Sequence, residues 1–138
     1  MPHYPTKEEI LAKEPNIREE VIEITNIWKK SSFSNWKKQT KEQKLENLQT
    51  LVLAIATISY NKTPIIITDH NQYCFKPLKK TIYFDSNNPS IISALHELGH
   101  FLFGPNELKT CQFSVWIFIK CFPKQYSKLR WQNHLLIK

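Results

Sequence analysis

The stretch HELGHFLFGPNE, residues 96–107, decides most of what can be expected of this chain. It holds both glycines of the 138-residue sequence, Gly99 and Gly104, and it places His96 and His100 four residues apart. Residues i and i+4 of a helix lie above one another on one face. Two imidazoles at this spacing can bind one zinc ion. The stretch therefore predicts either a metal site or the buried face of an ordinary helix.

The periodicity of the helix predicted over residues 90–103 separates these alternatives. At about 100° per residue, four apolar side chains fall within roughly 60° of each other, namely Ile91, Leu95, Leu98 and Leu102. His96 and His100 lie together roughly 150° from the centre of that stripe. Glu97 lies roughly 60–100° from the histidine pair, where it can take a proton from an attacking water. The pattern favours a metal site with Glu97 as the catalytic base.

A third metal ligand is expected after the second histidine, because catalytic zinc sites usually have three protein ligands. Glu107 is favoured, since the helix predicted to end at Gly104-Pro105 allows the chain to turn back toward His100. In a continuous helix Glu107 would lie about 10 Å further along the axis. His134 is the main alternative, and a cysteine or no third protein ligand also remains open.

The rest of the chain predicts an α+β fold of N-terminal helices, a small sheet and further helices. Helices are expected over residues 16–30 and 40–60, the second with a capping box of Thr40 and Gln43. Strands are expected over 64–68 and 81–85, with a short one near 73–75, and helices over 90–103, 107–121 and the tail from 124. Asn88 is the expected N-cap of the histidine helix, followed by Pro89 in its first turn.

The length of 138 residues predicts a single domain, 1–138. Within it, residues 1–15 carry prolines and charges and are expected to form a loosely ordered arm. A helical part is expected over 16–62, and the site-bearing core over 63–138.

Composition narrows the function classes. Hydrophobic residues make up 41% and the net charge is +7, with lysines in scattered pairs. Because no basic run is interleaved with aromatic residues, nucleic-acid binding is not favoured. The apolar runs 51–58 and 113–119 are too short to span a bilayer, and the start of the chain has no secretory signal pattern. Three cysteines without such a signal indicate reduced thiols and a cytoplasmic protein with no membrane association.

The motif formed by His96, Glu97 and His100 resembles that of the HExxH zinc metallopeptidases, the zincins. The wider pattern TIYFD followed by ISALHELGHFLFG resembles the small ImmA/IrrE-type metallopeptidases of bacteria and phages. In that family a strand and the active-site helix precede a glutamate of the form E-x-x-A, to which the segment from Glu107 to Cys111 is similar. The short gap before Glu107 resembles the glycine turn of metzincins, with glutamate in place of their third histidine.

The resemblance implies a minimal zincin-like fold and a zinc-dependent peptidase with one Zn²⁺ ion. It also implies a protein or peptide substrate, such as a regulator protein. The alternatives are a non-catalytic zinc-binding module and a basic module that binds protein or nucleic acid. Weaker candidates are Asp69 and His70 for metal or substrate, and three tyrosines for stabilising an oxyanion, namely Tyr73, Tyr83 and Tyr126.

Overall fold

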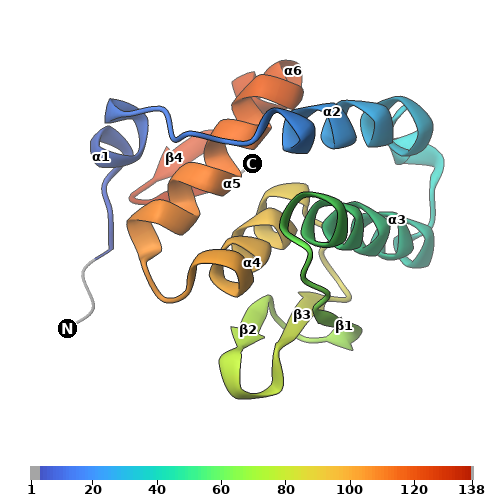
Figure 1. Ribbon diagram of the computed structural model, residues 1–138. Helices are drawn as coiled ribbons and strands as arrows, with labels where there is room; N and C mark the ends of the chain where they lie inside the picture. Colours follow the sequence, from blue (N-terminus) through green and yellow to red (C-terminus); the bar gives the residue numbers. More distant parts are fainter. Residues whose placement is uncertain (1–3, 138) are drawn as a thin grey trace.

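Helix α4 (Ile91–Phe103) carries the two histidines and lies near the centre of the computed structural model, which describes residues 4–137 (Figure 1). Its apolar stripe is buried, as predicted, over Ile91, Leu95 and Leu98. The predicted N-cap was wrong. Ser90 caps the helix, because its side chain accepts a hydrogen bond from the backbone N–H of Ser93. Asn88 lies before the cap and accepts the hydroxyl proton of Tyr73 through its carbonyl oxygen.

A three-stranded sheet lies below α4 and α3 in Figure 1. It consists of β1 (Ile65–His70), β2 (Cys74–Lys76) and β3 (Thr81–Asp85), in the order β1-β3-β2. Strand β3 is parallel to β1 and antiparallel to β2. All three predicted strands are present. The run TIYFD forms the central strand, and its first four residues are buried.

Two further helices form the predicted helical part. They are α2 (Glu19–Trp28) and α3 (Lys41–Ala54), extended by the π-helical turns η1 (Lys29–Phe33) and η3 (Ile55–Ser59). A 3₁₀ turn, η2 (Trp36–Lys38), connects them. The predicted capping box is present, with reciprocal hydrogen bonds between Thr40 and Gln43. Both helical predictions are therefore confirmed.

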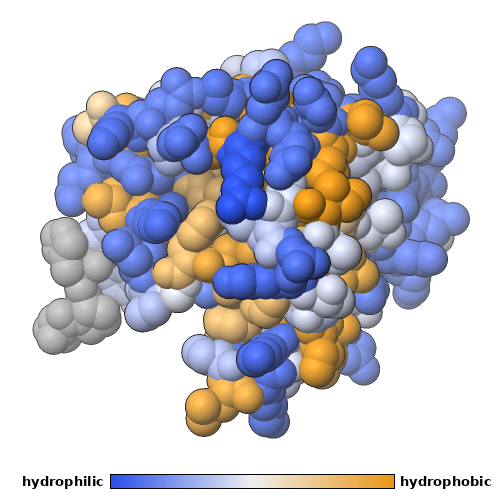
Figure 2. Space-filling view, viewed as in Figure 1, coloured by the Kyte–Doolittle hydropathy of each residue, from blue (hydrophilic) through white to orange (hydrophobic). Residues whose placement is uncertain are grey.

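The elements stack in layers, with the sheet on one side, α3 and α4 in the middle and α2 and α5 (Glu107–Cys121) on the other side (Figure 1). The main core lies between these layers. Figure 2 shows mostly hydrophilic residues on this face, interrupted by apolar patches. One apolar patch is at the protruding connection between β2 and β3, where Leu78 is fully exposed. The α+β class predicted from the sequence is confirmed.

The described part of the N-terminal arm is packed rather than loosely ordered. Residues Lys7–Ala12 form α1, which begins with a capping box of Thr6 and Glu9. Ile10 is fully buried beside Val115 of α5, and its carbonyl oxygen accepts a hydrogen bond of 3.1 Å from the indole N–H of Trp116. The burial of Ile10 anchors this short helix. The prolines and charges of the arm did not indicate this packing.

The C-terminal tail was predicted as a helix, and this prediction was wrong. Helix α5 ends at Cys121 as expected, and a short α6 (Pro123–Ser127) follows. The chain then forms an antiparallel hairpin of β4 (Arg130–Gln132) and β5 (Leu135–Ile137). Asn133 turns the hairpin with a φ of 58°, a left-handed conformation that asparagine tolerates better than most residues. The two-residue turn at Asn133 thus reverses the chain where a continuous helix was expected.

The structure bears on two further predictions, which concern membrane-spanning segments and the state of the cysteines. Within residues 4–137 no helix combines the length and the apolar character needed to cross a bilayer. The three cysteines, Cys74, Cys111 and Cys121, are free thiols.

Candidate metal centre

The turn between α4 and α5 brings the two halves of the candidate site together. Helix α4 ends at Gly104, whose φ of 81° is in the left-handed region that favours glycine. Asn106 then caps α5, since its side-chain oxygen accepts a 3.0 Å hydrogen bond from the backbone N–H of Lys109. Glu107 is the first residue of α5. The predicted reversal is therefore confirmed, and it takes only the three residues 104–106.

The two helices approach closely at Gly99. A Cβ atom on Gly99 would lie 2.9 Å from the methyl carbon of Thr110 and 3.4 Å from the Thr110 Cα. Real Cβ atoms essentially never lie 2.9 Å from another heavy atom, so an added Cβ would require the Thr110 side chain or α5 to move. Thr110 is fully buried, one turn after Glu107. The close contact at this mid-helix glycine is therefore with α5.

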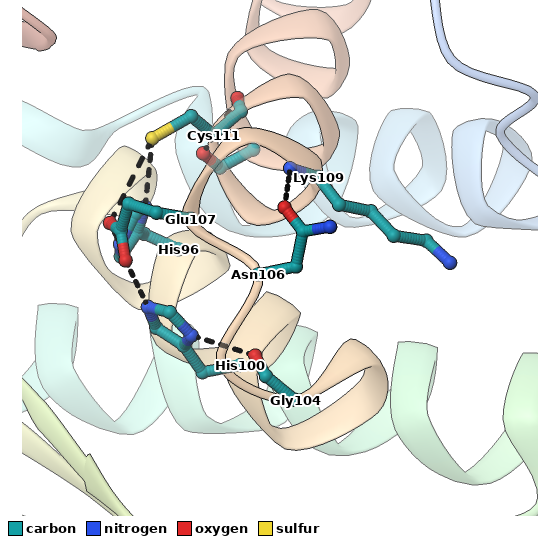
Figure 3. Close-up of polar contacts among 8 residues, drawn as sticks. His96, His100, Gly104, Asn106, Glu107, Lys109 and Cys111 are labelled. Carbon is teal, nitrogen blue, oxygen red and sulfur yellow. Dashed lines mark hydrogen bonds and ion pairs between the residues drawn. The ribbon is translucent and has the colours of Figure 1, made fainter. Parts of the chain in front are cut away.

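Both imidazoles of the motif face one carboxylate (Figure 3). His96 Nε2 lies 2.8 Å from Glu107 Oε1, and His100 Nε2 lies 3.0 Å from Glu107 Oε2. The three side chains are partly exposed, at 23%, 18% and 24% for His96, His100 and Glu107. The structure thus brings together the three residues expected as metal ligands, at the mouth of the α4–α5 turn.

The remaining ring nitrogen of His100 is also engaged. Its Nδ1 lies 2.9 Å from the carbonyl oxygen of Gly104 (Figure 3). A carbonyl oxygen can only accept, so the proton of this hydrogen bond is on Nδ1. Histidine ligands commonly donate one ring N–H to a carbonyl or carboxylate and present the other nitrogen to the metal. Gly104 therefore both ends α4 and fixes the ring of His100.

The donor set fits a zinc ion. Two imidazole nitrogens and one carboxylate form one of the ligand sets of catalytic zinc sites, with bonds of about 2.0–2.2 Å. At tetrahedral angles such bonds separate two donors by roughly 3.3 Å. The two separations of 2.8 and 3.0 Å run to different oxygens of Glu107. The group whose ligand atoms all lie within 4.8 Å of one another is His96, Glu107 and Cys111, so His100 would have to move closer to share the ion. Hydrogen bonds between the same groups satisfy them without an ion.

Charge and burial shift the pKa values of His96, Glu97 and Glu107. Burial opposes the charged form of His96, but its contacts with Cys111 and Glu107 and the nearby charge of Glu97 outweigh this and raise its pKa to about 10. The hydrogen bond from His96 holds the pKa of Glu107 below its ordinary value. Burial raises the pKa of Glu97, although the two histidines oppose that rise. A raised carboxyl pKa suits proton transfer near neutral pH.

Glu97 lines the same cavity as His96 and Glu107. The cavity has a volume of about 280 Å³. Glu97 is only 9% exposed, and the wall of the cavity includes Leu135 and Leu136 of the C-terminal hairpin. The predicted base is thus next to the predicted ligands in a partly enclosed space, into which a reactant can enter.

His134, the alternative third ligand, also lines this cavity. Its ring stacks on Tyr4, with centroids 4.5 Å apart and an interplanar angle of 10°. Glu107, rather than His134, is the residue in direct contact with both imidazoles. The geometry therefore favours Glu107 as the third ligand.

Cys111 is a neighbour of the site that the sequence named only as an open alternative. Its Sγ lies 3.9 Å from His96 Nδ1 and 3.9 Å from Glu107 Oε1. Together with these two residues it forms a group that could hold a metal ion. The spacing of four residues from Glu107 was the available signal, because it places both side chains on one face of α5.

The weaker candidates lie elsewhere or have other partners. Asp69 and His70 do not line the cavity, and the ring of His70 packs on Tyr83 of the central strand. Tyr73 lines the cavity, but its hydroxyl donates to Asn88 and accepts from the N–H of Ser90. Its pKa is raised by burial to about 12. The Tyr126 hydroxyl accepts a hydrogen bond from the indole of Trp131. These contacts place the tyrosines in structural roles.

Comparison with known proteins finds no family model, no curated protein and no solved structure that matches this chain.

Proposed function

We propose that this protein is a zinc-dependent metallopeptidase of the minimal zincin-like type, in which His96, His100 and Glu107 hold the ion. The observation that carries the proposal is the convergence of both Nε2 atoms on the Glu107 carboxylate, at 2.8 and 3.0 Å. Such a convergence needs the histidine spacing on α4, the turn at Gly104 and the close approach at Gly99. The order of strand β3, histidine helix and glutamate helix also agrees with the ImmA/IrrE-type resemblance.

A bound zinc ion supplies Lewis-acid chemistry, which lowers the pKa of water and polarises a carbonyl. Glu97 removes the proton from the attacking water and later passes it to the leaving amine. The burial that raises the pKa of Glu97 makes this carboxyl group hold the proton for the second transfer. His100 is kept in position by Gly104, and Glu107 by its place at the start of α5.

The substrate is a protein or peptide segment that reaches the cavity beside Glu97. The walls contributed by Ile92, Val115 and Leu136 are apolar. A chain of 138 residues leaves little surface for a deep cleft, so recognition extends over the surface of a protein substrate, such as a regulator protein.

The test is Glu97→Gln, with Glu46→Gln as the control, since Glu46 is an exposed glutamate within helix α3. Zinc content is measured by elemental analysis, and cleavage with casein and a fluorogenic peptide library. The wild type and Glu46→Gln should bind one equivalent of zinc and cleave. Glu97→Gln should bind zinc and lose cleavage by at least about 100-fold.

Two results would contradict the proposal in different ways. A wild type that retains well under one equivalent of zinc excludes a zinc centre. A wild type that binds zinc but cleaves no substrate points to a non-catalytic zinc module. The third ligand is tested separately, since Glu107→Ala should weaken zinc binding far more than His134→Ala.

A further inference from the structure

Cys111 lies beside two of the three proposed ligands, His96 and Glu107 (Figure 3). Its side chain is 3% exposed and packs with Ile10 and Val115 in a small apolar cluster. The thiol touches one proposed ligand from each helix, His96 of α4 and Glu107 of α5. Of the three cysteines among the described residues, Cys111 is the one with these contacts. Cys121 lies ten residues further along α5, with its Sγ 4.0 Å from the carbonyl oxygen of Ile22.

The two histidines differ in what their Nδ1 atoms contact. His100 Nδ1 faces the carbonyl oxygen of Gly104 at 2.9 Å. His96 Nδ1 faces the Cys111 sulfur at 3.9 Å, a distance at the long end of the range for sulfur. A histidine that presents Nε2 to a metal carries its proton on Nδ1 and needs an acceptor there. For His96 this acceptor is the sulfur atom.

The thiol also has a proton to donate, and Glu107 Oε1 lies 3.9 Å from the sulfur. Cysteine is both a weak donor and a weak acceptor. It can therefore accept from His96 and donate to Glu107 at the same time. The i, i+4 spacing of Glu107 and Cys111 on α5 makes this contact a consequence of the helix itself.

We propose that Cys111 is a positioning residue that holds His96 and Glu107 in register for the metal ion without binding the ion itself. This inference rests on the proposed zinc centre. Nδ1, rather than the metal-facing Nε2, is the nitrogen of His96 for which a contact with the sulfur exists. In the proposed arrangement the sulfur acts through the imidazole and the carboxylate. Its Sγ also lies within 4.8 Å of a ligand atom of each of these two residues, so direct binding by the thiolate is the competing arrangement, which cobalt substitution tests.

The experiment compares Cys111→Ala, Cys111→Ser and the control Cys121→Ala, which removes the other buried thiol of α5. Zinc affinity is measured by competition with a chromophoric chelator, and unfolding of the metal-free proteins by urea titration. Cys111→Ala should lose about 10- to 100-fold in zinc affinity, the usual cost of removing a partner of a metal-ligating histidine. Cys111→Ser keeps a donor and an acceptor and should recover most of this loss. Cys121→Ala should bind zinc like the wild type.

Three results overturn the inference. One is a Cys111→Ala variant that binds zinc as tightly as the wild type, even if it is less stable, because the thiol is then only a packing group. Another is a Cys111→Ser variant that binds zinc no better than Cys111→Ala while folding normally. The third is an intense sulfur-to-metal charge-transfer band in the cobalt-substituted wild type that Cys111→Ala abolishes, because the thiolate is then a direct ligand. By contrast, a wild type that binds neither zinc nor cobalt contradicts the proposed zinc centre itself.

Discussion

The contact between α4 and α5 and the aromatic cluster at the far end of α5 hold the same helix in two different ways. At Gly99 the helices approach so closely that one added carbon would meet Thr110 at 2.9 Å. In the aromatic cluster, Phe122 packs against Phe33, Phe118 and Trp28 with ring centroids 5.2–6.3 Å apart. The first contact sets a position, and the second buries a large apolar area.

The difference indicates that separate regions of this small fold provide stability and set the geometry of the candidate site. Large aromatic side chains such as Phe122 bury a large apolar area each and so contribute strongly to stability. The glycine contact contributes little apolar area, but it determines where Glu107 lies relative to the two imidazoles. Stability and zinc affinity should therefore respond to different substitutions.

The largest effect on stability is expected for Phe122→Ala. Phe122 is fully buried, and truncation of a buried phenylalanine costs about 3–5 kcal/mol. Urea titration should show this loss, while the zinc affinity of the folded variant should equal that of the wild type. If zinc affinity falls together with stability, the two regions do not contribute separately to these two properties.

The next largest effect is a pH dependence of the stability that the α4–α5 contact contributes to the metal-free protein. The pKa of His96, raised from 6.5 to about 10, means that its stabilisation is complete below pH 6.5 and is lost as the pH rises toward 10. The lowered pKa of Glu107 means that its contribution is present above pH 4.5 and is lost as the pH falls below that value. This pair should therefore stabilise the metal-free protein most between pH 4.5 and 6.5.

Urea titrations of wild type and Glu107→Ala with a chelator should differ by about 1.5–3 kcal/mol in this window, and by less at pH 10. With zinc present the trend should reverse between pH 5 and 7.5, since binding needs deprotonated ligands. If the stability difference between wild type and Glu107→Ala does not change with pH, the protonation of His96 and Glu107 does not control this contact. Phe122→Ala is the control, because this substitution removes no titratable group.

Gly99→Ala should cost about 1–3 kcal/mol, because the added carbon forces α5 outward. Zinc affinity should fall as well, by about 10-fold or more, since Glu107 moves with α5. Adding Thr110→Ser should restore much of both losses, because it removes the methyl group that the new Cβ would meet at 2.9 Å. Gly99→Ala binding zinc normally would show that the site does not depend on the close approach.

The smallest effect is expected for Thr110→Val, which is the control for Gly99→Ala and Thr110→Ser. The Thr110 hydroxyl is buried without a hydrogen-bond partner in the part of the chain described by the structure. Replacing it by a methyl group of the same shape should change stability by less than about 1 kcal/mol, toward stabilisation. Zinc affinity should stay unchanged. A clear loss of stability would reveal a partner for this hydroxyl.

The C-terminal half shows why some predictions succeeded and others failed. Helix α5 begins at Glu107 and ends at Cys121, as predicted from its apolar run. The tail is amphipathic and was predicted as a helix, yet it forms a hairpin whose Trp131 and Leu136 pack against α1 and α5. Its two three-residue strands are stabilised by that packing rather than by their own sequence, so local pattern alone could not identify them.

Within the site, the sequence by itself determined the relations that follow from helix periodicity and chain reversal. These are the shared face of His96 and His100, the place of Glu97 beside them and the return of Glu107 after Gly104. They are local, because they depend on a few residues and the 3.6-residue turn. Only the tertiary structure decided the contact of Gly99 with Thr110 and the contact of Cys111 with His96. Both depend on how closely two helices pack, and that distance is set by side chains from the whole core.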